Sequence, residues 1–366
     1  MKFQTITIFG LGLIGGSIAA ALRHKRVPMK IIGVDKGPVI QKALSLNLIH
    51  SGFSITDDFG PGLAETELVI LAAPIKQILE LLERIPSKLQ PGTLVTDVGS
   101  TKECIVETAH NHLPQDVYFL GAHPMAGSEK SGVEHADPFL FENAVYILTE
   151  RETVPEEILA SFVEFIDLLG AAPLFLPAQF HDEIAAAVSH LPQLLSVTLM
   201  QCARKRSENN PALLKLAGGG FRDMTRIASS PYSMWADIFE TNRENIESVL
   251  SEFQAVLEKI KLMFLENRLR PIFEEAGRSR LSIPHVNRGF LNPYFDVVVI
   301  VEDKPGVIAE IASSLAEKNI NIKDIEILKV REGEAGTLRL AFESHQQRES
   351  AIKLLAQKGY QATSRD

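Results

Sequence analysis

The sequence GLGLIGGS, residues 10–17, identifies the architecture of the first part of the chain. It follows the short apolar run TITIF and opens an alanine-rich apolar segment, an order that predicts a strand, a tight turn and a helix. Gly10, Gly12 and Gly15 have the G-x-G-x-x-G spacing, which brings backbone N–H groups at a helix N-terminus close to a pyrophosphate. A similar turn also occurs in folds that bind no nucleotide, so the prediction needs a second signal.

The second signal is an acidic residue at the end of the next predicted strand, KIIGVD at 30–35. Asp35 lies 20 residues after Gly15, where an acid hydrogen-bonds the ribose hydroxyls and repels a 2′-phosphate. Lys36, next to it, is the feature that favours NADP. We predict NAD as the cofactor. The other residues expected at the cofactor are Leu13 and Ile14 in the turn, Ala73 and Pro74 after the third predicted strand, and Ser100 after the fourth.

Strand and helix patterns alternate over residues 1–177, which predicts a parallel sheet with helices on both faces. The further predicted strands are 67–74, 92–100, 117–124, 144–150 and 172–177. We expect the last two to extend the same sheet. This region is therefore predicted to be a Rossmann-type, doubly wound α/β domain that binds NAD.

The strand pattern stops there, and residues 178–290 form a second predicted domain, which is all-α. The helical segment 180–208 contains Pro192, which should kink or break it. The clearest helix is 241–266, where apolar residues recur at three- and four-residue steps. A helix this long needs a partner surface. Its periodicity fits packing within the monomer and packing against a second subunit equally well.

The third predicted domain is 294–366, after the linker LNPYF at 291–295. Its strand and helix patterns follow the order β-α-β-β-α-β, which is the ferredoxin-like α+β arrangement.

Composition narrows the class of protein. The 366 residues include two cysteines, Cys104 and Cys202, so we expect no disulfide framework and a reducing, cytoplasmic location. The net charge of −9 argues against a nucleic acid or an anionic membrane surface as the main partner. We expect no membrane-spanning segment, because no apolar run reaches the length of about 18 residues that one requires.

A histidine in GAHPMAGSEKSG, residues 121–132, is the candidate proton acceptor. His123 follows the fifth predicted strand and Ser100 follows the fourth, and ligands of a doubly wound sheet bind beyond the carboxyl ends of its strands. A neutral imidazole can accept the proton of an alcohol whose hydride leaves for NAD. Ser100 can orient that alcohol, cap the helix that follows it, or do both. A structural role for His123 is the alternative.

The segment GGGFRDMTRIASSPYSMW contains a second candidate cluster. Arg222 and Arg226 are four residues apart, so on a helix they would share a face, and arginine binds carboxylates in a two-pronged geometry. A solvated basic face is the alternative, and Trp235 fits a core position as well as a ligand contact. Asp182 and His190 are poorly spaced for a metal, and we predict no metal site.

Together these motifs resemble the prephenate dehydrogenase family. GLGLIGGS, DVGSTK, GAHPMAGSEKSG, HD…SHLP and GGGFRDMTRIASSPYSMW occur in the family's order over residues 1–290. EDKPGVIAEIASSLAEKNINIKDIEI, at 302–327, resembles an ACT domain, a module that commonly binds amino acids as regulators. The resemblance implies NAD-dependent oxidative decarboxylation of prephenate to 4-hydroxyphenylpyruvate in tyrosine biosynthesis. It also implies a homodimer formed through the helical domain and regulation by tyrosine through the ACT domain.

The resemblance also implies residue roles. His123 would accept a hydrogen bond from the 4-hydroxyl of prephenate with help from Ser100, and Arg226 would bind a carboxylate. The other substrate-binding residues it implies are Ser128, Glu129, His190, Gln193 and Trp235. Many relatives have a second histidine where this chain has Gln193, in SHLPQ, so the choice between prephenate and arogenate stays open.

Two further functions remain open. Another NAD-linked dehydrogenase of the same plan, such as a 3-hydroxyacid dehydrogenase, usually relies on a lysine in the helical domain. The histidine loop and the arginine cluster of this chain fit that chemistry less well. A non-catalytic, NAD-binding amino-acid sensor is disfavoured by the intact His123 and Ser100, and absence of turnover would favour it.

Overall fold

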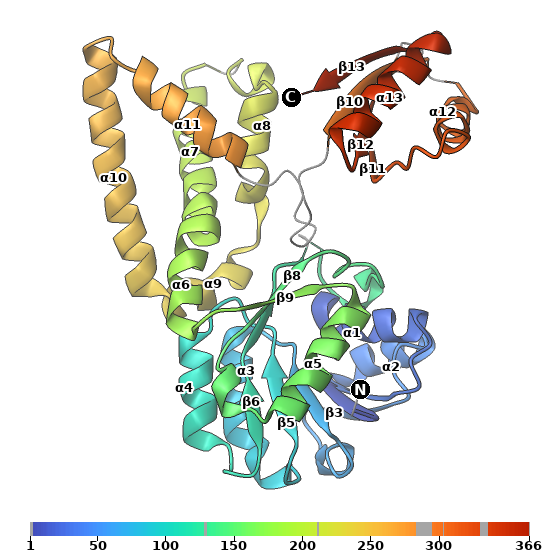
Figure 1. The fold of residues 1–366 in the computed structure, drawn as a ribbon. Coiled ribbons are helices and arrows are strands. Elements are labelled where there is room, and N and C mark those ends of the chain that lie inside the picture. The colour runs from blue at the N-terminus through green and yellow to red at the C-terminus, as the bar shows by residue number, and fades with distance from the viewer. Residues whose placement is uncertain are drawn as a thin grey trace. The chain divides into compact units, whose positions relative to one another are not determined.

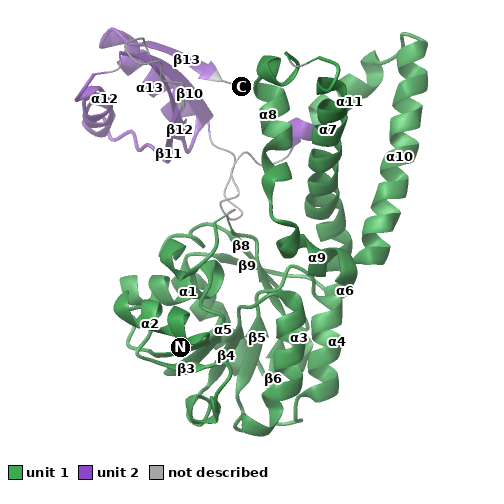
Figure 2. Cartoon of the chain, turned by 180° about the vertical axis from the view of Figure 1, so that it is seen from behind, with its two compact units in different colours: residues 1–279, 287–289 green, residues 280–286, 290–366 purple. Residues whose placement is uncertain are grey.

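The computed structural model describes residues 3–127, 130–210, 212–282, 295–302, 304–329 and 336–365. The chain divides into two compact units, residues 1–279 with 287–289 and residues 280–286 with 290–366 (Figure 2). Each unit has a hydrophobic core of its own.

Six parallel strands form the main sheet of the first unit (Figure 1). They are β1 Thr5–Phe9, β2 Lys30–Asp35, β3 Ser51–Ser54, β4 Leu68–Leu71, β5 Leu94–Asp97 and β6 Tyr118–Leu120. Their order, β3-β2-β1-β4-β5-β6, is that of a dinucleotide-binding doubly wound sheet. The apolar runs of β4 and β5 are buried along their whole length, as a sheet covered on both faces requires.

Helices cover both faces of this sheet (Figure 1). The core on one face includes α1 Leu13–His24, α2 Gly37–Ser45 and α5 Glu156–Leu169. The core on the other face includes α3 Ile75–Arg84 and α4 Glu103–His112. The small residues of α1 are buried, so this helix can lie close to the strands and its N-terminus can face the end of β1.

A separate three-stranded sheet follows β6. It consists of β7 Ala122–Pro124, β8 Val145–Leu148 and β9 Ala172–Phe175, with β7 antiparallel to β8. Our expectation that the later strands extend the main sheet is therefore wrong. The chain leaves that sheet at Gly121, whose carbonyl accepts a hydrogen bond from the backbone of Thr149 at 2.8 Å, so the end of β8 pairs there. His123 consequently lies on β7, beyond the carboxyl end of β6.

Helices make up the rest of the first unit. They are α6 Ala178–Ala185, a π-helical turn Ala186–His190, α7 Leu191–Ser207, α8 Gly219–Thr225, a 3-10 turn Arg226–Ser229, α9 Tyr232–Thr241, α10 Arg243–Leu265 and α11 Arg270–Ser282. The expected break at Pro192 takes the form of the single π turn that joins α6 to α7. Such a turn accommodates the hydrogen bond that proline cannot donate, and it often marks a functional site.

The long helix predicted from the sequence is α10. Within this helix, which the structure describes in full, only Ile246 is buried. Large apolar side chains of α10 are instead exposed in the single chain: Val256, Leu257, Leu262, Phe264 and Leu265.

The second unit has the predicted β-α-β-β-α-β order. It consists of β10 Phe295–Val301, α12 Val307–Ala316, β11 Asp324–Lys329, β12 Gly336–Phe342, α13 His345–Gln357 and β13 Gln361–Arg365. The antiparallel sheet has the order β11-β12-β10-β13, and its apolar face packs on the two helices. In the described part of the chain, no helix is long and apolar enough to cross a membrane.

Candidate active site

The three glycines of the β1–α1 turn have different surroundings. Gly10 has a φ of +87°, and a Cβ added there would lie 2.2 Å from the carbonyl oxygen of Ala72. A Cβ on Gly15 would lie 2.0 Å from the carbonyl oxygen of Gly10. A Cβ on Gly12 would meet nothing within 4 Å. The protein's own packing therefore requires Gly10 and Gly15, whereas Gly12 borders open space at the N-terminus of α1, where a pyrophosphate can approach.

Asp35 lies against this turn. Its Oδ2 accepts a hydrogen bond from the backbone N–H of Leu11 at 2.7 Å, and its Oδ1 accepts one from Lys36 at 2.6 Å. Ala73 lies on the other side of the turn, with its nitrogen 3.2 Å from the position that a Cβ on Gly10 would take. The remaining cofactor candidates lie where the elements around the turn begin: Leu13 and Ile14 start α1, and Pro74 is the N-cap residue of α3. The turn, the carboxylate and the open space fit a dinucleotide.

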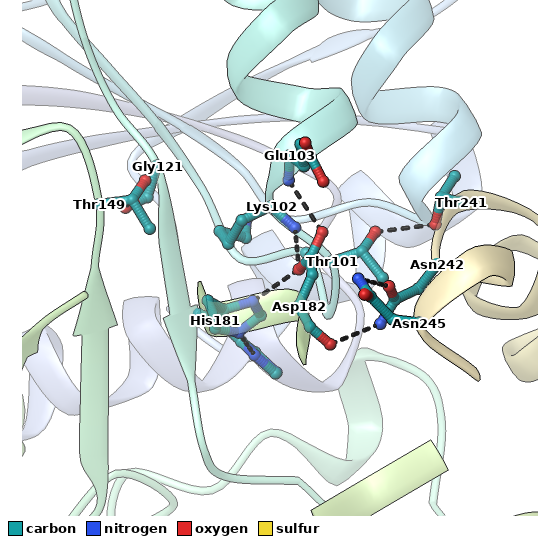
Figure 3. Close-up of polar contacts among 12 residues, drawn as sticks. Thr101, Lys102, Glu103, Gly121, Thr149, His181, Asp182, Thr241, Asn242 and Asn245 are labelled. Atoms are coloured by element: carbon teal, nitrogen blue, oxygen red, sulfur yellow. Dashed lines mark hydrogen bonds and ion pairs between the residues drawn. The ribbon is translucent and has the colours of Figure 1, made fainter. Parts of the chain in front are cut away.

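His123 is partly buried and is joined to a chain of buried polar groups on α6. Its Nδ1 lies 2.8 Å from Nε2 of His181. Nδ1 of His181 in turn lies 2.7 Å from Oδ1 of Asp182 (Figure 3). His181 and Asp182 are each 1% exposed. The sequence predicted no role for His181, and Asp182 was considered only together with His190, as a poorly spaced pair of metal ligands. Among the described residues, no group of three or more His, Cys, Asp or Glu side chains is placed to hold a metal ion.

Asp182 also caps a helix of the Rossmann domain. Its Oδ1 accepts a hydrogen bond from the backbone N–H of Lys102 at 2.7 Å, and its Oδ2 accepts one from Glu103 at 3.0 Å (Figure 3). The proposed cap role of Ser100 is therefore wrong. Helix α4 begins at Glu103, its N-cap residue is Lys102, and the capping carboxylate comes from α6. Ser100 is partly buried in the connection between β5 and α4.

A fully buried ion pair fixes the backbone next to His123. Lys102 Nζ contacts Asp97 Oδ2, and both side chains are 0% exposed. Lys102 Nζ also donates to the carbonyl oxygen of Ala122 at 2.8 Å, and Asp97 Oδ1 accepts from the backbone N–H of Ala122 at 3.0 Å. The backbone N–H and carbonyl groups of Ala122, the residue before His123, are therefore both hydrogen-bonded. The sequence analysis missed this pair, although both residues lie in the DVGSTK motif.

The environment keeps two imidazoles neutral. Burial holds the pKa of His123 well below its usual range, and repulsion from His181, Lys102 and His190 in their charged forms lowers it further. Burial lowers the pKa of His190 to about 4. Both rings are therefore unprotonated at pH 7, and a neutral imidazole has one nitrogen that can accept a proton.

Three predicted substrate-binding residues lie around the π turn. His190 ends this turn, its Nδ1 is 3.2 Å from Nδ2 of Asn242, and its ring meets Trp235 edge-on at 6.0 Å. Trp235 is partly buried on α9, and its indole N–H has no hydrogen-bond partner among the described residues. Gln193 is 3% exposed on α7. Its Nε2 donates to the carbonyl oxygen of Ile227 at 3.0 Å, and its Oε1 accepts no hydrogen bond from any residue that the structure describes.

The arginine cluster differs from the expected arrangement. Helix α8 ends at Thr225, between Arg222 and Arg226, so the two arginines do not share one α-helical face. Arg226 begins the 3-10 turn and is exposed. The predicted residues Ser128 and Glu129 lie outside the described residues. The structure thus groups His123, His190 and Trp235 with the newly found His181 and Asp182, and it leaves Arg226 at the surface of the chain.

The chain matches two models of the same family in succession. Residues 18–174 match the prephenate dehydrogenase nucleotide-binding domain, and residues 177–275 match the prephenate dehydrogenase dimerization domain. Residues 297–357 match the ACT domain of the AHAS small subunit-like type.

Individual proteins resemble the chain over most of its length. A prephenate dehydrogenase of Bacillus subtilis (strain 168) is 37% identical over 354 residues, which are 95% of this chain and 94% of that protein. A prephenate dehydrogenase of Lactococcus lactis subsp. cremoris is 35% identical over 357 residues, 96% and 97% of the two chains. The crystal structure of prephenate dehydrogenase from A. aeolicus, in complex with hydroxyphenyl propionate and NAD+, has a TM-score of 0.71 and 32% identity. That match covers 77% of this chain and 99% of the other.

Proposed function

The chain belongs to the prephenate dehydrogenase family, and from this premise we propose that it oxidises prephenate with NAD, giving 4-hydroxyphenylpyruvate and CO2. The observation that carries the proposal is the neutral His123, beyond the carboxyl end of the sheet whose β1–α1 turn fits a dinucleotide. The carboxylate of Asp35 at that turn supports NAD over NADP, because its charge opposes a 2′-phosphate.

In the proposed reaction, NAD supplies the acceptor for the hydride that leaves C4 of the substrate. His123 accepts the hydrogen bond of the C4 hydroxyl and takes up its proton as positive charge develops at C4. His123 returns this proton to the oxygen when the bond to the ring carboxylate breaks and CO2 leaves, because the released electron pair completes the aromatic ring. The product is a phenol, and no net proton is released. Ser100 is proposed to orient the same hydroxyl.

Polar residues of the helical domain are proposed to bind the substrate's carboxylates and side chain. The amide nitrogen of Asn242 can only donate to Nδ1 of His190, so the neutral ring carries its proton on Nε2 and can donate it to a carboxylate. Arg226 is the proposed carboxylate-binding arginine. The hydrogen bond from Gln193 to Ile227 holds the backbone beside it. Trp235, with Ser128 and Glu129, completes the proposed set.

Arogenate is the second candidate substrate, and the Oε1 atom of Gln193 favours it. This atom is buried and has no partner in the described part of the chain, and a buried acceptor without a donor carries a free-energy cost that a bound donor would relieve. The side-chain ammonium of arogenate is such a donor, whereas the keto oxygen of prephenate is not. A steady-state comparison of kcat/KM for the two substrates with NAD+ distinguishes them.

The deciding experiment follows NADH formation by the purified protein with prephenate and NAD+. We expect turnover, and we expect His123→Asn to lower kcat by roughly 10²–10⁴ while NAD affinity is retained, since the phosphates are bound at the glycine turn. A near-normal kcat in this variant would remove His123 from the reaction. Absence of turnover by the unaltered protein with either substrate would favour a non-catalytic sensor.

We further propose that the three predicted domains have different functions. Residues 1–177 bind NAD, residues 178–290 bind substrate and form a homodimer, and residues 294–366 regulate. The exposed apolar face of α10 supports the dimer, because side chains such as Phe264 and Leu265, 64% and 68% exposed, are normally covered by a partner.

The proposed effector is an amino acid, specifically tyrosine, bound where Gly306 opens α12 in the left-handed conformation. The cysteines Cys104 and Cys202 are unpaired, which supports a reducing, cytoplasmic location.

A further inference from the structure

We propose that His181 and Asp182 are positioning residues that fix the tautomer of His123, so that Nε2 of His123 is the nitrogen that lacks a proton. The inference rests on the proposed function of His123 as proton acceptor. The tautomer itself can be measured without turnover, so the two proposals can fail separately.

The neighbours of Asp182 allow its carboxylate only to accept hydrogen bonds. The backbone N–H groups of Lys102 and Glu103 can only donate, and they reach its two oxygens at 2.7 and 3.0 Å (Figure 3). Both groups belong to the N-terminus of α4, where the helix dipole favours a negative charge. Asp182 is therefore a hydrogen-bond acceptor. The ring nitrogen of His181 that lies 2.7 Å from Oδ1 must be a donor, so Nδ1 of His181 carries a proton.

The proton on Nδ1 of His181 determines the next contact. A neutral imidazole that is protonated on Nδ1 has its lone pair on Nε2. This lone pair faces Nδ1 of His123 at 2.8 Å, so His123 must donate from Nδ1. The neutral His123 then has its own lone pair on Nε2. In the described part of the chain, no hydrogen bond reaches this nitrogen, and it remains open to a substrate hydroxyl.

The opposite tautomer is disfavoured by the same contacts. If Nε2 of His123 carried the proton, two ring lone pairs would face each other across 2.8 Å, and one buried hydrogen bond would be lost. A cationic His181 would avoid this by donating to His123. The 15N experiment described below distinguishes that arrangement, because His181 would then carry protons on both ring nitrogens. The charged and titratable groups around His123 are His181, Asp182, Lys102 with its partner Asp97, and His190.

The hydrogen-bond chain from His123 through His181 to Asp182 also stabilises His123 while His123 holds the substrate proton. The imidazolium formed at that moment keeps its Nδ1–H bond to His181, which remains bonded to the Asp182 carboxylate. An aspartate plays the corresponding part in a Ser-His-Asp triad, where its amide analogue leaves the geometry intact but imposes the wrong tautomer. His181 and Asp182 act here through His123 and do not touch the reacting atoms.

The first test measures the tautomers directly by NMR of the full-length protein with 15N-labelled histidine side chains. The His123 signals are assigned by their loss in His123→Asn. We expect Nδ1 of His123 to be protonated and Nε2 to be unprotonated, and we expect Asp182→Asn to give the reverse or a mixture. A wild-type His123 protonated on Nε2 would overturn the proposal. So would an unchanged tautomer in Asp182→Asn.

The second test uses kinetics and a rescue variant at His181. His181→Leu removes the acceptor, and we expect kcat to fall about 10²-fold or more with KM for NAD+ unchanged. His181→Gln places an amide oxygen near the position of Nε2, so it should retain most of the activity. Equal losses in the two variants would reduce His181 to a packing residue.

Thr241→Val is the matched control, because it removes a different hydrogen bond between the β5–α4 connection and the helical region. That bond joins the hydroxyls of Thr101 and Thr241 at 2.8 Å and does not involve the histidines. We expect this variant to keep its kcat. A loss as large as that of His181→Leu would contradict the proposal, since it would show that any loosening of this junction stops the reaction. Thermal unfolding of each variant shows whether it is folded, and the wild-type NMR result decides the tautomer even if a variant is not.

Discussion

Replacement of Gly12 by alanine should weaken NAD binding without loosening the fold. Gly12 has a φ of −68°, which alanine adopts without strain, and its added Cβ would touch nothing within 4 Å. The free energy of unfolding should therefore change by no more than about 0.5 kcal/mol. The methyl group would occupy the space that the pyrophosphate needs. Loss of one hydrogen bond to a charged phosphate oxygen costs about 1.5–3 kcal/mol, or roughly a 10- to 100-fold rise in Kd.

Gly15→Ala is the matched control, because its effect should be the opposite. The new Cβ would lie 2.0 Å from the carbonyl oxygen of Gly10 and 3.0 Å from the side chains of Ala72 and Ile8. Such overpacking costs about 1–3 kcal/mol of stability, and more where the neighbour is backbone. Calorimetric titration with NAD+ and urea unfolding of both variants provide the comparison. A Gly12→Ala protein with wild-type Kd, or one as unstable as Gly15→Ala, would refute the assignment of the open space to the cofactor.

The remaining predictions concern specificity, substrate binding, pH and regulation. Asp35→Asn should raise kcat/KM for NADP+ relative to NAD+, because it removes the charge that opposes the 2′-phosphate; a wild-type protein that uses both cofactors equally would contradict this. Arg226→Ala should raise KM for prephenate about 30-fold or more, from a loss of about 2–5 kcal/mol, while KM for NAD+ stays constant. The pKa of His190, about 4, lies below the value of 6.5 expected in the unfolded chain, so its contribution to stability is complete above pH 6.5 and is lost as the pH falls towards 4. The free energy of unfolding lost between pH 6.5 and pH 4 is up to about 3 kcal/mol. Urea unfolding measured across this range should therefore depend less on pH in His190→Gln than in the wild-type protein. A chain ending at residue 291 should lose inhibition by tyrosine, as should Gly306→Val; equal inhibition of the shortened and full-length enzymes would mean competition at the active site.

The parts of the fold that could be predicted are those with local signals. The glycine spacing, the alternating strands and the β-α-β-β-α-β order each depend on residues close together in sequence, and all three were predicted correctly. The short strand β3 was missed because SGFS contains a single large apolar residue. The second sheet was misassigned because an apolar run looks the same whichever strand it pairs with. The long-range hydrogen bond between Gly121 and Thr149 and the pairing of β7 with β8 show where the chain changes sheets.

In the candidate site, too, the residues with a local sequence signal could be predicted and those defined by long-range contacts could not. Gly12 was predicted from the G-x-G-x-x-G spacing, and Asp35 from its position 20 residues after Gly15 at the end of a predicted strand. The contacts of His181 and Asp182 with His123 and α4 were missed because these are polar residues without periodicity, and their role depends on partners far along the chain. His123 and His181 are 58 residues apart, and Asp182 is 80 residues from the backbone N–H of Lys102. A histidine-aspartate pair at the start of a helix gives no indication of which distant group it will meet.

These long-range contacts explain why the proposed cofactor site and the proposed proton acceptor depend on different parts of the chain. The glycine turn, Asp35 and the open space at Gly12 are complete within the Rossmann sheet and α1. His123 also lies in that part, but Asp182, on α6, caps α4 and joins His181 to it. The Rossmann region alone would keep the surface that fits NAD, but α4 would lose its capping carboxylate and His123 would lose the group that orients its proton. On the proposed mechanism, the helical region therefore acts on His123 through its first helix, in addition to carrying the proposed substrate-binding residues and the exposed face of α10.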